Sequence, residues 1–408
     1  MNNTVVHTYK QTEIGIIPED WEIGNMLTNS TLKARIGWQG LTTSEYLKIG
    51  NFYLVTGTDF FDGKIKWETC HFVEEIRYTQ DRNIQLRDND ILVTKDGTIG
   101  KVAFVDKLTL PATLNSGVFV IRPKNNAYLP HFLFYILKSF YFDNFLNQLV
   151  AGSTIQHLYQ KDFVTFNFVI PPLAEQTAIA TALSDADALI GSLETLIAKK
   201  RNIKQGAMQQ LLQPKESWEV KTLGEIANVV GGGTPSTFVS SYWNGTINWF
   251  TPTEIGDKKY IYESLRKITK EGFINCSGKM LPKGTVLLTA RASIGDIGIL
   301  MNEACTNQGF QSLIAKDGYN NEFIYYLLTT LKNVLLQNAS GSTFLEISPN
   351  KIKQIEVSVP NINEQIYIAK ILGDMDSQIQ SLETKLEKYR NIKQGMMQNL
   401  LTGKIRLI

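Results

Sequence analysis

The sequence predicts an α+β protein in which two β-rich domains with helices are separated by a long antiparallel two-helix coiled coil. Three observations predict it: an internal tandem repeat, a heptad pattern in the more similar part of each copy, and turn-punctuated β-rich sequence in the rest. Two copies of one unit also predict an internal pseudo-twofold axis. The length of 408 residues agrees, because single cores seldom grow beyond about 250–300 residues.

The repeat is clearest in the segment Arg-Asn-Ile-Lys-Gln-Gly, which occurs at 201–206 and again at 390–395, an offset of 189. At that offset, residues 152–212 and 341–401 align without a gap and are identical at 27 of 61 positions. Upstream the likeness weakens and the offset drifts; at Ile99 and Ile294 it is 195. We therefore expect four parts: a first domain at 1–170, a helical spacer at 171–213, a second domain at 214–359 and a second spacer at 360–408.

Apolar residues in both spacers follow the alternating spacing of three and four that marks the a and d positions of a heptad. These positions are Ile179, Leu183, Ala186, Ile190, Leu193 and Ile197 in the first copy, and Ile368, Leu372, Met375, Ile379, Leu382, Leu386 and Tyr389 in the second. Each helix is acidic in its front half and basic in its back half, so antiparallel pairing brings opposite charges together. The alternative, helices that pack only on their own domains, stays open.

The stretch Lys-Gln-Gly-x-Met-Gln is present in both spacers, at 204–209 and 393–398. It is either a solvated face or a docking surface for a partner helix, and its repetition favours docking. The candidate docking residues are Arg201, Lys204, Gln205, Arg390, Lys393 and Gln394.

Each β-rich domain contains a predicted strand followed by a glycine-containing turn, at 95–101 and 290–296. Each turn combines a cation with a small hydroxyl residue, Lys95 with Thr98 and Arg291 with Ser293. With backbone N–H groups, this combination suits contact with phosphates or guanine edges. A solvated hairpin is the open alternative. Matching Asn-x-Gly turns at Asn115 and Asn307 either contact adenine or supply left-handed turn geometry.

The segment 231–236 begins the second domain with three glycines and lacks the Gly-Lys-Ser/Thr ending of a nucleotide-binding P-loop. A flexible loop near a phosphate backbone remains as its interpretation. With the two turns, it completes the candidate nucleic-acid-binding residues, which are Lys95, Thr98, Lys101, Thr234, Ser236, Arg291 and Ser293.

The sequence carries no motif of a common catalytic site. An Asn/Asp-Pro-Pro-Tyr/Phe quartet, a Gly-x-Ser-x-Gly elbow and a His-Glu-x-x-His pair are all absent from it. Its four histidines and three cysteines lack metal-ligand spacing. No apolar run approaches the roughly 18–20 residues of a membrane span, and the polar N-terminus lacks a signal peptide's apolar stretch. We expect a cytoplasmic protein without catalytic residues, bound metal, cofactor or membrane partner.

Two variable domains that alternate with two near-identical helices resemble the specificity subunit of type I restriction–modification systems, over essentially the whole chain. The resemblance is carried by Glu-Ile-Gly-Ile-Ile-Pro-Glu-Asp-Trp at 13–21, Gly-Thr-Ile-Gly at 97–100, Gly-Gly-Thr-Pro-Ser at 232–236 and the repeated tails Arg-Asn-Ile-Lys-Gln-Gly-x-Met-Gln-x-Leu-Leu. Each motif alone is weak, whereas their order and duplication are specific.

The resemblance implies that each domain is a target recognition domain that reads half of an asymmetric bipartite site in double-stranded DNA. It implies that the helices set the gap and dock two modification (methyltransferase) subunits, which restriction (endonuclease and translocase) subunits join in defence against foreign DNA. Adenine methylation with S-adenosylmethionine, and cleavage with ATP and Mg²⁺, would belong to those partners. The net charge of +2 implies that the partners also neutralise most DNA phosphates. A non-enzymatic coiled-coil adaptor that joins two protein partners is the alternative function.

Overall fold

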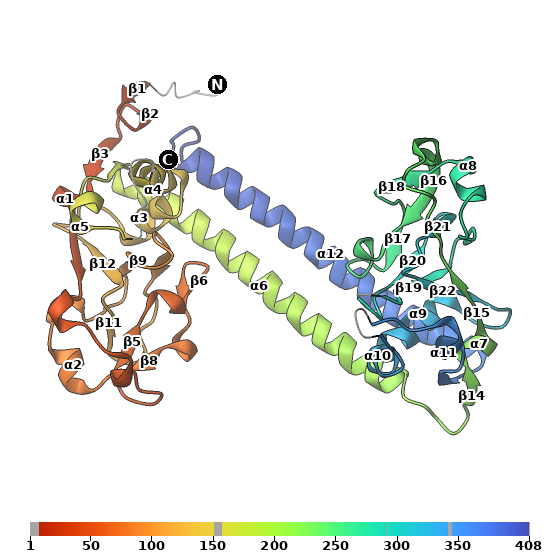
Figure 1. Ribbon diagram of the computed structural model, residues 1–408. Coiled ribbons are helices and arrows are strands. Elements are labelled where there is room, and N and C mark those ends of the chain that lie inside the picture. Colours follow the sequence, from red (N-terminus) through yellow and green to blue (C-terminus); the bar gives the residue numbers. More distant parts are fainter. Residues whose placement is uncertain (1–7, 151–156, 292, 342–344, 408) are drawn as a thin grey trace, which may run out of the picture. The chain divides into compact units, whose positions relative to one another are not determined.

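The computed structural model describes residues 8–407 except 151–156, 292 and 342–344. The chain divides into two compact units. Unit 1 comprises Met1–Glu194 with Thr384–Ile408, and unit 2 is Thr195–Glu383. Two long helices, α6 (Leu173–Leu211) and α12 (Ile362–Leu400), each contribute residues to both units (Figure 1).

Unit 1 contains a sheet of four antiparallel strands in the order β10–β9–β12–β4 and a sheet of three, β11–β5–β8, in which β11 and β5 are parallel. Its strands are β1 (Tyr9–Thr12), β2 (Gly15–Pro18), β3 (Glu22–Asn25), β4 (Ser30–Ala34), β5 (Tyr53–Val55), β6 (Phe60–Phe61), β7 (Lys64–Ile65), β8 (His71–Phe72), β9 (Ile91–Thr94), β10 (Val102–Phe104), β11 (Ala112–Leu114), β12 (Val118–Pro123) and β13 (Asn167–Ile170). Its shorter helices are α1 (Met26–Asn29), α2 (Glu75–Thr79), α3 (Pro130–Leu137), α4 (Phe140–Val150) and α5 (Gln160–Phe163).

Unit 2 contains a five-stranded sheet in the order β15–β22–β19–β20–β17 and a three-stranded sheet, β18–β16–β21, in which β16 and β21 are parallel. Its strands are β14 (Glu219–Thr222), β15 (Ala227–Gly231), β16 (Trp243–Phe250), β17 (Tyr260–Ile261), β18 (Arg266–Ile268), β19 (Val286–Leu288), β20 (Ile297–Leu300), β21 (Ala304–Thr306), β22 (Gln311–Ala315) and β23 (Glu356–Val359). Its shorter helices are α7 (Leu223–Ile226), α8 (Lys270–Ile274), α9 (Asn321–Thr330), α10 (Lys332–Gln337) and α11 (Pro349–Lys353).

Nine of the described strands of each unit share one topology, to which unit 2 adds β17 and unit 1 adds the pairs β1–β2 and β6–β7. The order β10–β9–β12–β4 of unit 1 corresponds to β20–β19–β22–β15 of unit 2, and β11–β5–β8 corresponds to β21–β16–β18. The antiparallel pair β13–β3 corresponds to β23–β14, which likewise joins the start of its unit to the strand before a long helix. The duplicated sequence therefore folds as a duplicated architecture, even where the sequences have diverged.

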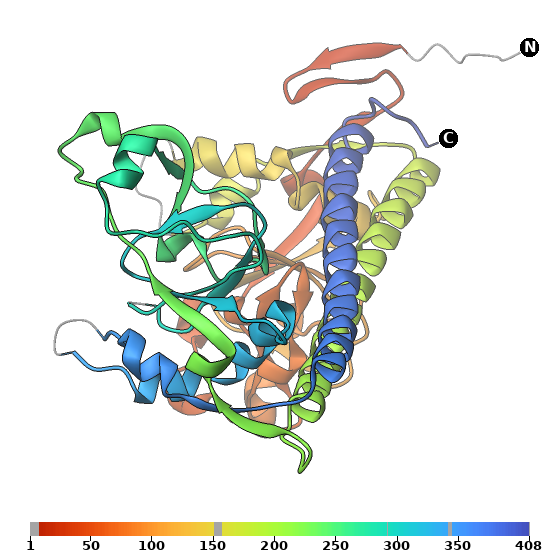
Figure 2. The same ribbon diagram turned by 90° about the vertical axis from the view of Figure 1, so that its right-hand side faces the viewer.

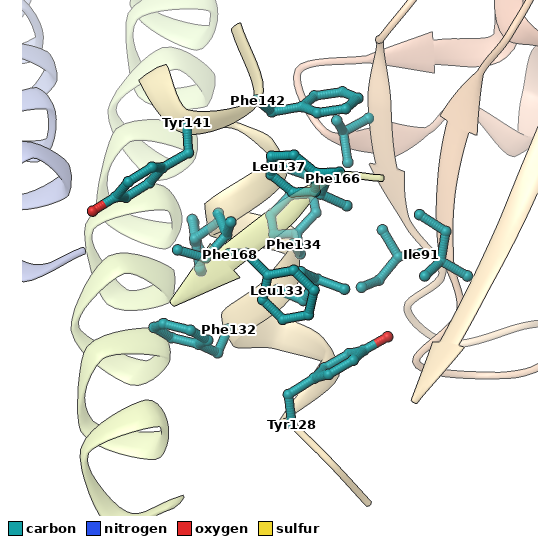
Figure 3. Close-up of a cluster of buried hydrophobic side chains, with 14 of the residues drawn as sticks. Ile91, Tyr128, Phe132, Leu133, Phe134, Leu137, Tyr141, Phe142, Phe166 and Phe168 are labelled. Atoms are coloured by element: carbon teal, nitrogen blue, oxygen red, sulfur yellow. The ribbon is translucent and has the colours of Figure 1, made fainter. Parts of the chain in front are cut away.

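The core of unit 1 lies between the main sheet, α3 and the first turns of α6. Figure 3 shows Phe132 beside α6 and Ile91 on the sheet, with Leu133 and Phe168 between them. The same cluster includes Ile179 of α6. At that repeat position in unit 2, Ile368 of α12 packs into the domain core. The first turns of both helices therefore pack on their own domains, as one reading of the sequence allowed.

Within each unit, the segments of α6 and α12 run antiparallel and are joined by ion pairs. In unit 1, Arg390 contacts Glu194 at 2.6 Å and Lys393 contacts Asp187. In unit 2, Arg201 contacts Glu383 at 2.5 Å and Lys204 contacts Asp376. Each predicted heptad residue is buried or half-buried. The acidic and basic halves of the helices thus pair as their sequence order predicts.

The C-terminal segment of unit 1 packs against the start of the chain. Gly403 has φ +68°, as expected for a residue that ends a helix, and a Cβ there would lie 2.4 Å from a carbon of Pro18. Tyr9 donates a hydrogen bond from its hydroxyl to the Gly403 carbonyl at 3.2 Å. Figure 2 shows the β1–β2 hairpin beside this end of α12.

Candidate functional site

The turn after β9 is held by the side chain of Thr94. Its hydroxyl donates to the Thr98 carbonyl at 2.5 Å and accepts from the Lys101 backbone N–H at 2.9 Å. Gly97 and Gly100 have φ values of +69° and +81°, which favour glycine. Thr98 and Lys101 are exposed at this turn. The third candidate, Lys95, is half-buried, and its ammonium lies 5.4 Å from the centre of the Phe119 ring.

The turn after β19 repeats these bonds. The Thr289 hydroxyl donates to the Ser293 carbonyl at 2.5 Å and accepts from the Asp296 backbone N–H at 2.9 Å. Gly295 donates its N–H to the Thr289 carbonyl at 3.1 Å, as Gly100 does to Thr94 at 2.9 Å. One hydrogen-bonded skeleton therefore builds both turns.

The shared skeleton shows which residues of the two turns correspond. Thr98 corresponds to Ser293, because their carbonyls accept from the equivalent threonine hydroxyls. Lys95 corresponds to Ala290, because each donates its N–H to the matching glycine carbonyl, at 2.9 and 2.7 Å. Asp96 consequently corresponds to Arg291. The cations Lys95 and Arg291 do not occupy equivalent places, since Lys95 points over an aromatic ring and Arg291 forms an ion pair with Glu346 at 2.8 Å.

A cavity of about 350 Å³ lies beside the unit 1 turn. It is lined by Tyr46, Thr56, Gly57, Thr58, Thr94, Asp96, Gly97, Thr98, Lys101, Asn115 and Gly117. Two of the predicted residues, Thr98 and Lys101, are among them, with further hydroxyl, amide and carboxylate groups. The lining can therefore donate hydrogen bonds to a polar ligand edge and accept them from it.

The segment that begins at Thr56, one of the residues lining this cavity, is also repeated in unit 2. Thr56 and Asp59 form a capping box in which the Asp59 carboxylate accepts from the Thr56 N–H at 2.8 Å. Thr251 and Glu254 form the same box at the same distance. The scaffold around both turns is thus conserved within the chain, while some side chains that it presents differ.

Asn115 and Asn307 stabilise the turns that contain them, but they do so through side-chain hydrogen bonds and not through left-handed backbone geometry. Each side-chain carbonyl accepts from the N–H two residues on, of Gly117 at 3.0 Å and of Gly309 at 2.9 Å. Left-handed backbone is found at other residues, such as Asn125 and Asn126. The asparagine side chains, rather than left-handed geometry, hold these turns.

The segment 231–236 is firmly held. The indole N–H of Trp249 donates to the Gly233 carbonyl at 2.9 Å, and that of Trp243 donates to the Ser236 carbonyl at 3.1 Å. Thr234 and Ser236 are exposed, and the Thr234 hydroxyl donates to Gln308 at 2.5 Å. The glycines serve close packing, so the flexible loop expected here is instead tied to the three-stranded sheet.

Gly232→Ala should destabilise unit 2 by about 1–3 kcal/mol, the usual cost of overpacking. A Cβ at Gly232 would lie 2.1 Å from the Asn307 carbonyl oxygen, so the backbone has to move. Urea unfolding measures the change. Gly206→Ala is the control, because a Cβ there meets no atom within 4 Å and the helix should gain stability. Equal effects of the two changes would contradict this account.

The candidate docking residues divide into two groups. Arg201, Lys204, Arg390 and Lys393 form the ion pairs between α6 and α12 described above. Gln205 and Gln394 are exposed on the helices. The four cations therefore take part in helix pairing, and the two glutamines present amide groups to solvent.

Sequence reasoning missed two repeated side chains that tie the domains to the helices. Tyr135 of α3 donates to Asp187 at 2.9 Å, and Tyr326 of α9 donates to Asp376 at 2.5 Å. Burial and the neighbouring carboxylate raise the pKa of both phenols. The repeat could have indicated the two aspartates, because Asp187 and Asp376 are related by the offset of 189, as are the lysines that bind them.

The described residues contain no cluster of three or more potential metal ligands. Burial raises the pKa of the Cys305 thiol to about 12, so this thiol is protonated and unreactive near neutral pH. None of their helices combines the length and apolar character that crossing a membrane requires. What the turns present are hydrogen-bonding and charged groups suited to binding.

Comparison with known proteins places these features in one family. The sequence matches the family described as the type I restriction modification DNA specificity domain over residues 43–201 and again over 215–389. The MjaIX type I restriction enzyme specificity subunit of Methanocaldococcus jannaschii is 40% identical over 190 residues, which are 46% of this chain and 44% of that protein. The chain thus aligns with less than half of that relative. The MjaVIII specificity subunit of the same organism is 26% identical over 423 residues, 96% of this chain and 94% of the relative.

Solved structures share the fold. The type I restriction–modification system S subunit from M. genitalium superposes with a TM-score of 0.61 at 18% identity and covers 93% of this chain and 96% of its own. A chain from a structure of a type I R-M system complex superposes with a TM-score of 0.54 at 18% identity, covering 95% of this chain and 99% of its own.

Proposed function

Since this chain belongs to the type I restriction modification DNA specificity family, whose domain it contains twice, we propose that it selects the DNA sequence for a restriction–modification complex. Each unit reads one half of an asymmetric bipartite site in double-stranded DNA. The observation that carries this proposal is the pair of turns, which share one skeleton but present different side chains. A duplicated reader with unlike contacts suits two unlike half-sites, whereas identical contacts would suit a palindrome.

The helices serve as the spacer and the docking surface. Their pairing by four ion pairs supports a coiled coil with a pseudo-twofold axis. Exposed residues in the repeated stretch, among them Gln205 and Gln394, dock one modification subunit on each copy. Those subunits supply adenine methylation with S-adenosylmethionine, and restriction subunits add ATP- and Mg²⁺-dependent cleavage. This chain itself is not an enzyme.

A nuclease footprint of the chain bound to its methyltransferase subunits tests the proposal. It should show two short protected half-sites with a fixed gap, and methylation-pattern sequencing of host DNA should return the same bipartite motif. Binding should weaken steeply with salt, because phosphate contacts release counterions. One continuous footprint, or protection indifferent to sequence, would refute the function.

Lengthening both helices should widen the gap. A heptad added to α6 between Leu196 and Ile197, matched by one at the equivalent position of α12, lengthens each by about 10 Å. That length corresponds to roughly three base pairs at about 3.4 Å per step. Methylation-pattern sequencing should return the old half-sites at the new gap. A heptad in α6 alone is the control, since it misaligns the ion pairs and should impair binding. Altered half-site letters would count against a spacer.

A further inference from the structure

The two recognition turns carry opposite charges at the same place in their common skeleton. Asp96 of unit 1 stands where Arg291 stands in unit 2, as the shared hydrogen bonds of the flanking residues establish. We propose that these two residues select one base pair in each half-site. Asp96 accepts a hydrogen bond from the amino group of cytosine, and Arg291 donates two to guanine. The inference rests on the proposed function and names the residues that carry it out.

The backbone places the two side chains alike. The residues just before them, Lys95 and Ala290, donate to Gly117 and Gly309 at 2.9 and 2.7 Å. Their carbonyls accept from the N–H groups of Leu158 and Ile347, at 2.8 and 3.1 Å. The backbone N–H and carbonyl of the preceding residue are therefore both hydrogen bonded, which places Asp96 and Arg291 alike on the backbone of their turns.

Each side chain also contacts a side chain on the opposite strand of an isolated antiparallel β-bridge. Asp96 is hydrogen bonded to His157, and Arg291 pairs with Glu346 at 2.8 Å. The partners His157 and Glu346 themselves are related by the repeat offset of 189. The turn residue and its partner therefore both differ between the two copies. Unit 1 has an acidic residue in the turn bound to a histidine, whereas unit 2 has a basic residue in the turn paired with a glutamate.

These pairs differ from buried structural ion pairs in their exposure. The Asp96 side chain is 44% exposed and that of Arg291 is 43% exposed, so both reach solvent while held in place. The ion-pair contact with Glu346 is at the inner nitrogen Nε of Arg291, which is buried and makes no hydrogen bond to a described residue. Asp96 further lines the 350 Å³ cavity, beside Thr58 and Thr98. A base edge at this point would meet an oriented carboxylate or guanidinium.

A second charge reversal in the turn is less suited to reading bases. Lys101 of unit 1 corresponds to Asp296 of unit 2, since each donates its N–H to the conserved threonine hydroxyl. Asp296 is bound to Lys332 of α10 at 3.1 Å. This carboxylate anchors the turn to its own unit, and its side chain is 27% exposed against 43% for that of Arg291.

The test exchanges the pairs in the full chain bound to its methyltransferase subunits. Asp96→Arg with His157→Glu installs the unit 2 pair in unit 1, and Arg291→Asp with Glu346→His does the reverse. Selection from DNA libraries randomised in both half-sites gives the preferred letters. We expect the first exchange to convert one cytosine of the first half-site to guanine, with roughly a ten- to hundred-fold change in preference. The second half-site should stay unchanged and serves as an internal control.

Lys267→Glu with Glu263→Lys reverses an exposed ion pair of unit 2 that is not among the candidate binding residues, and it should leave all letters unchanged. An exchange that weakens binding to every sequence alike, with both half-sites intact, would show that the pairs only hold the turns and would overturn the inference. If an exchanged chain fails to fold, Arg291→Met decides, because methionine keeps an unbranched side chain of similar length but has no N–H group to donate to guanine. That variant should lose the guanine preference, and keeping it would refute the assignment. A wild-type complex without a bipartite preference would instead refute the proposed function.

Discussion

Arg406→Ala should destabilise unit 1 by about 3–5 kcal/mol, the cost of leaving a buried charge without its partner. Arg406 donates to both carboxylate oxygens of Glu175, at 2.6 and 2.7 Å, and Glu175 is 0% exposed. The same guanidinium binds the carboxylate of Asp20 with two bonds, at 3.0 and 2.7 Å. It therefore fastens the C-terminal segment to the start of the chain and to α6. Urea unfolding, with hydrogen exchange to assign the transition to unit 1, measures the loss.

A matched control exists in unit 2. Glu364, the repeat counterpart of Glu175, pairs with Lys215 at 2.6 Å, but the two side chains are 26% and 55% exposed. Lys215→Ala should therefore cost at most about 1 kcal/mol. Adding Glu175→Gln to Arg406→Ala should recover part of the loss, because the amide is neutral and its carbonyl still accepts from Trp21. Equal losses for Arg406→Ala and Lys215→Ala would contradict a role for the buried carboxylate.

The helices were predictable because their information is local and periodic. Heptad spacing and the split of charge along each helix predicted where α6 and α12 run and which way they pair. The bonds that attach these helices to the domains were not predictable, since they join residues distant in sequence. Gln176 and Gln365 illustrate this: each accepts from a loop N–H, of Leu129 at 2.8 Å and of Asn320 at 2.9 Å. Their identity in the two copies was visible, but its structural reason was not.

The two turns after β9 and β19 were located from the sequence, but which of their residues correspond is established by the structure. A cation and a small hydroxyl residue are found in each turn, but composition alone does not say which residues correspond. The offset of 195 at the neighbouring Ile99 and Ile294 already places Arg291 on Asp96. Hydrogen bonds settle the register because threonine hydroxyls and backbone groups, rather than the charges, define the turn. Thr94 and Thr289 were therefore the residues to align first.

Leu183→Ala and Leu372→Ala should each cost about 2–5 kcal/mol, and each should loosen its own unit. The two leucines occupy the same heptad position in the repeat and are both 0% exposed. Leu183 belongs to the core of unit 1 with Phe132, and Leu372 to that of unit 2 with Phe323. Hydrogen exchange resolved along the chain should show faster opening in the unit that carries the substitution. Ile203→Ala, at a side chain 49% exposed, should stay within about 0.5 kcal/mol.

Hydrogen exchange should also distinguish the residues of α6 that pack on the domain core from those that pack on α12. Ile190 lies three residues after Asp187, which binds α12, so it faces the partner helix. It is only 6% exposed, and Ile190→Ala should mainly loosen the pairing of α6 with α12. Substitutions early in the helix should therefore disturb the domain core, whereas those further along should disturb the coiled coil. If Leu183→Ala spared the core and loosened only the helix pair, the domains would be attached through the coiled coil alone, contrary to the packing of Ile179 and Leu183.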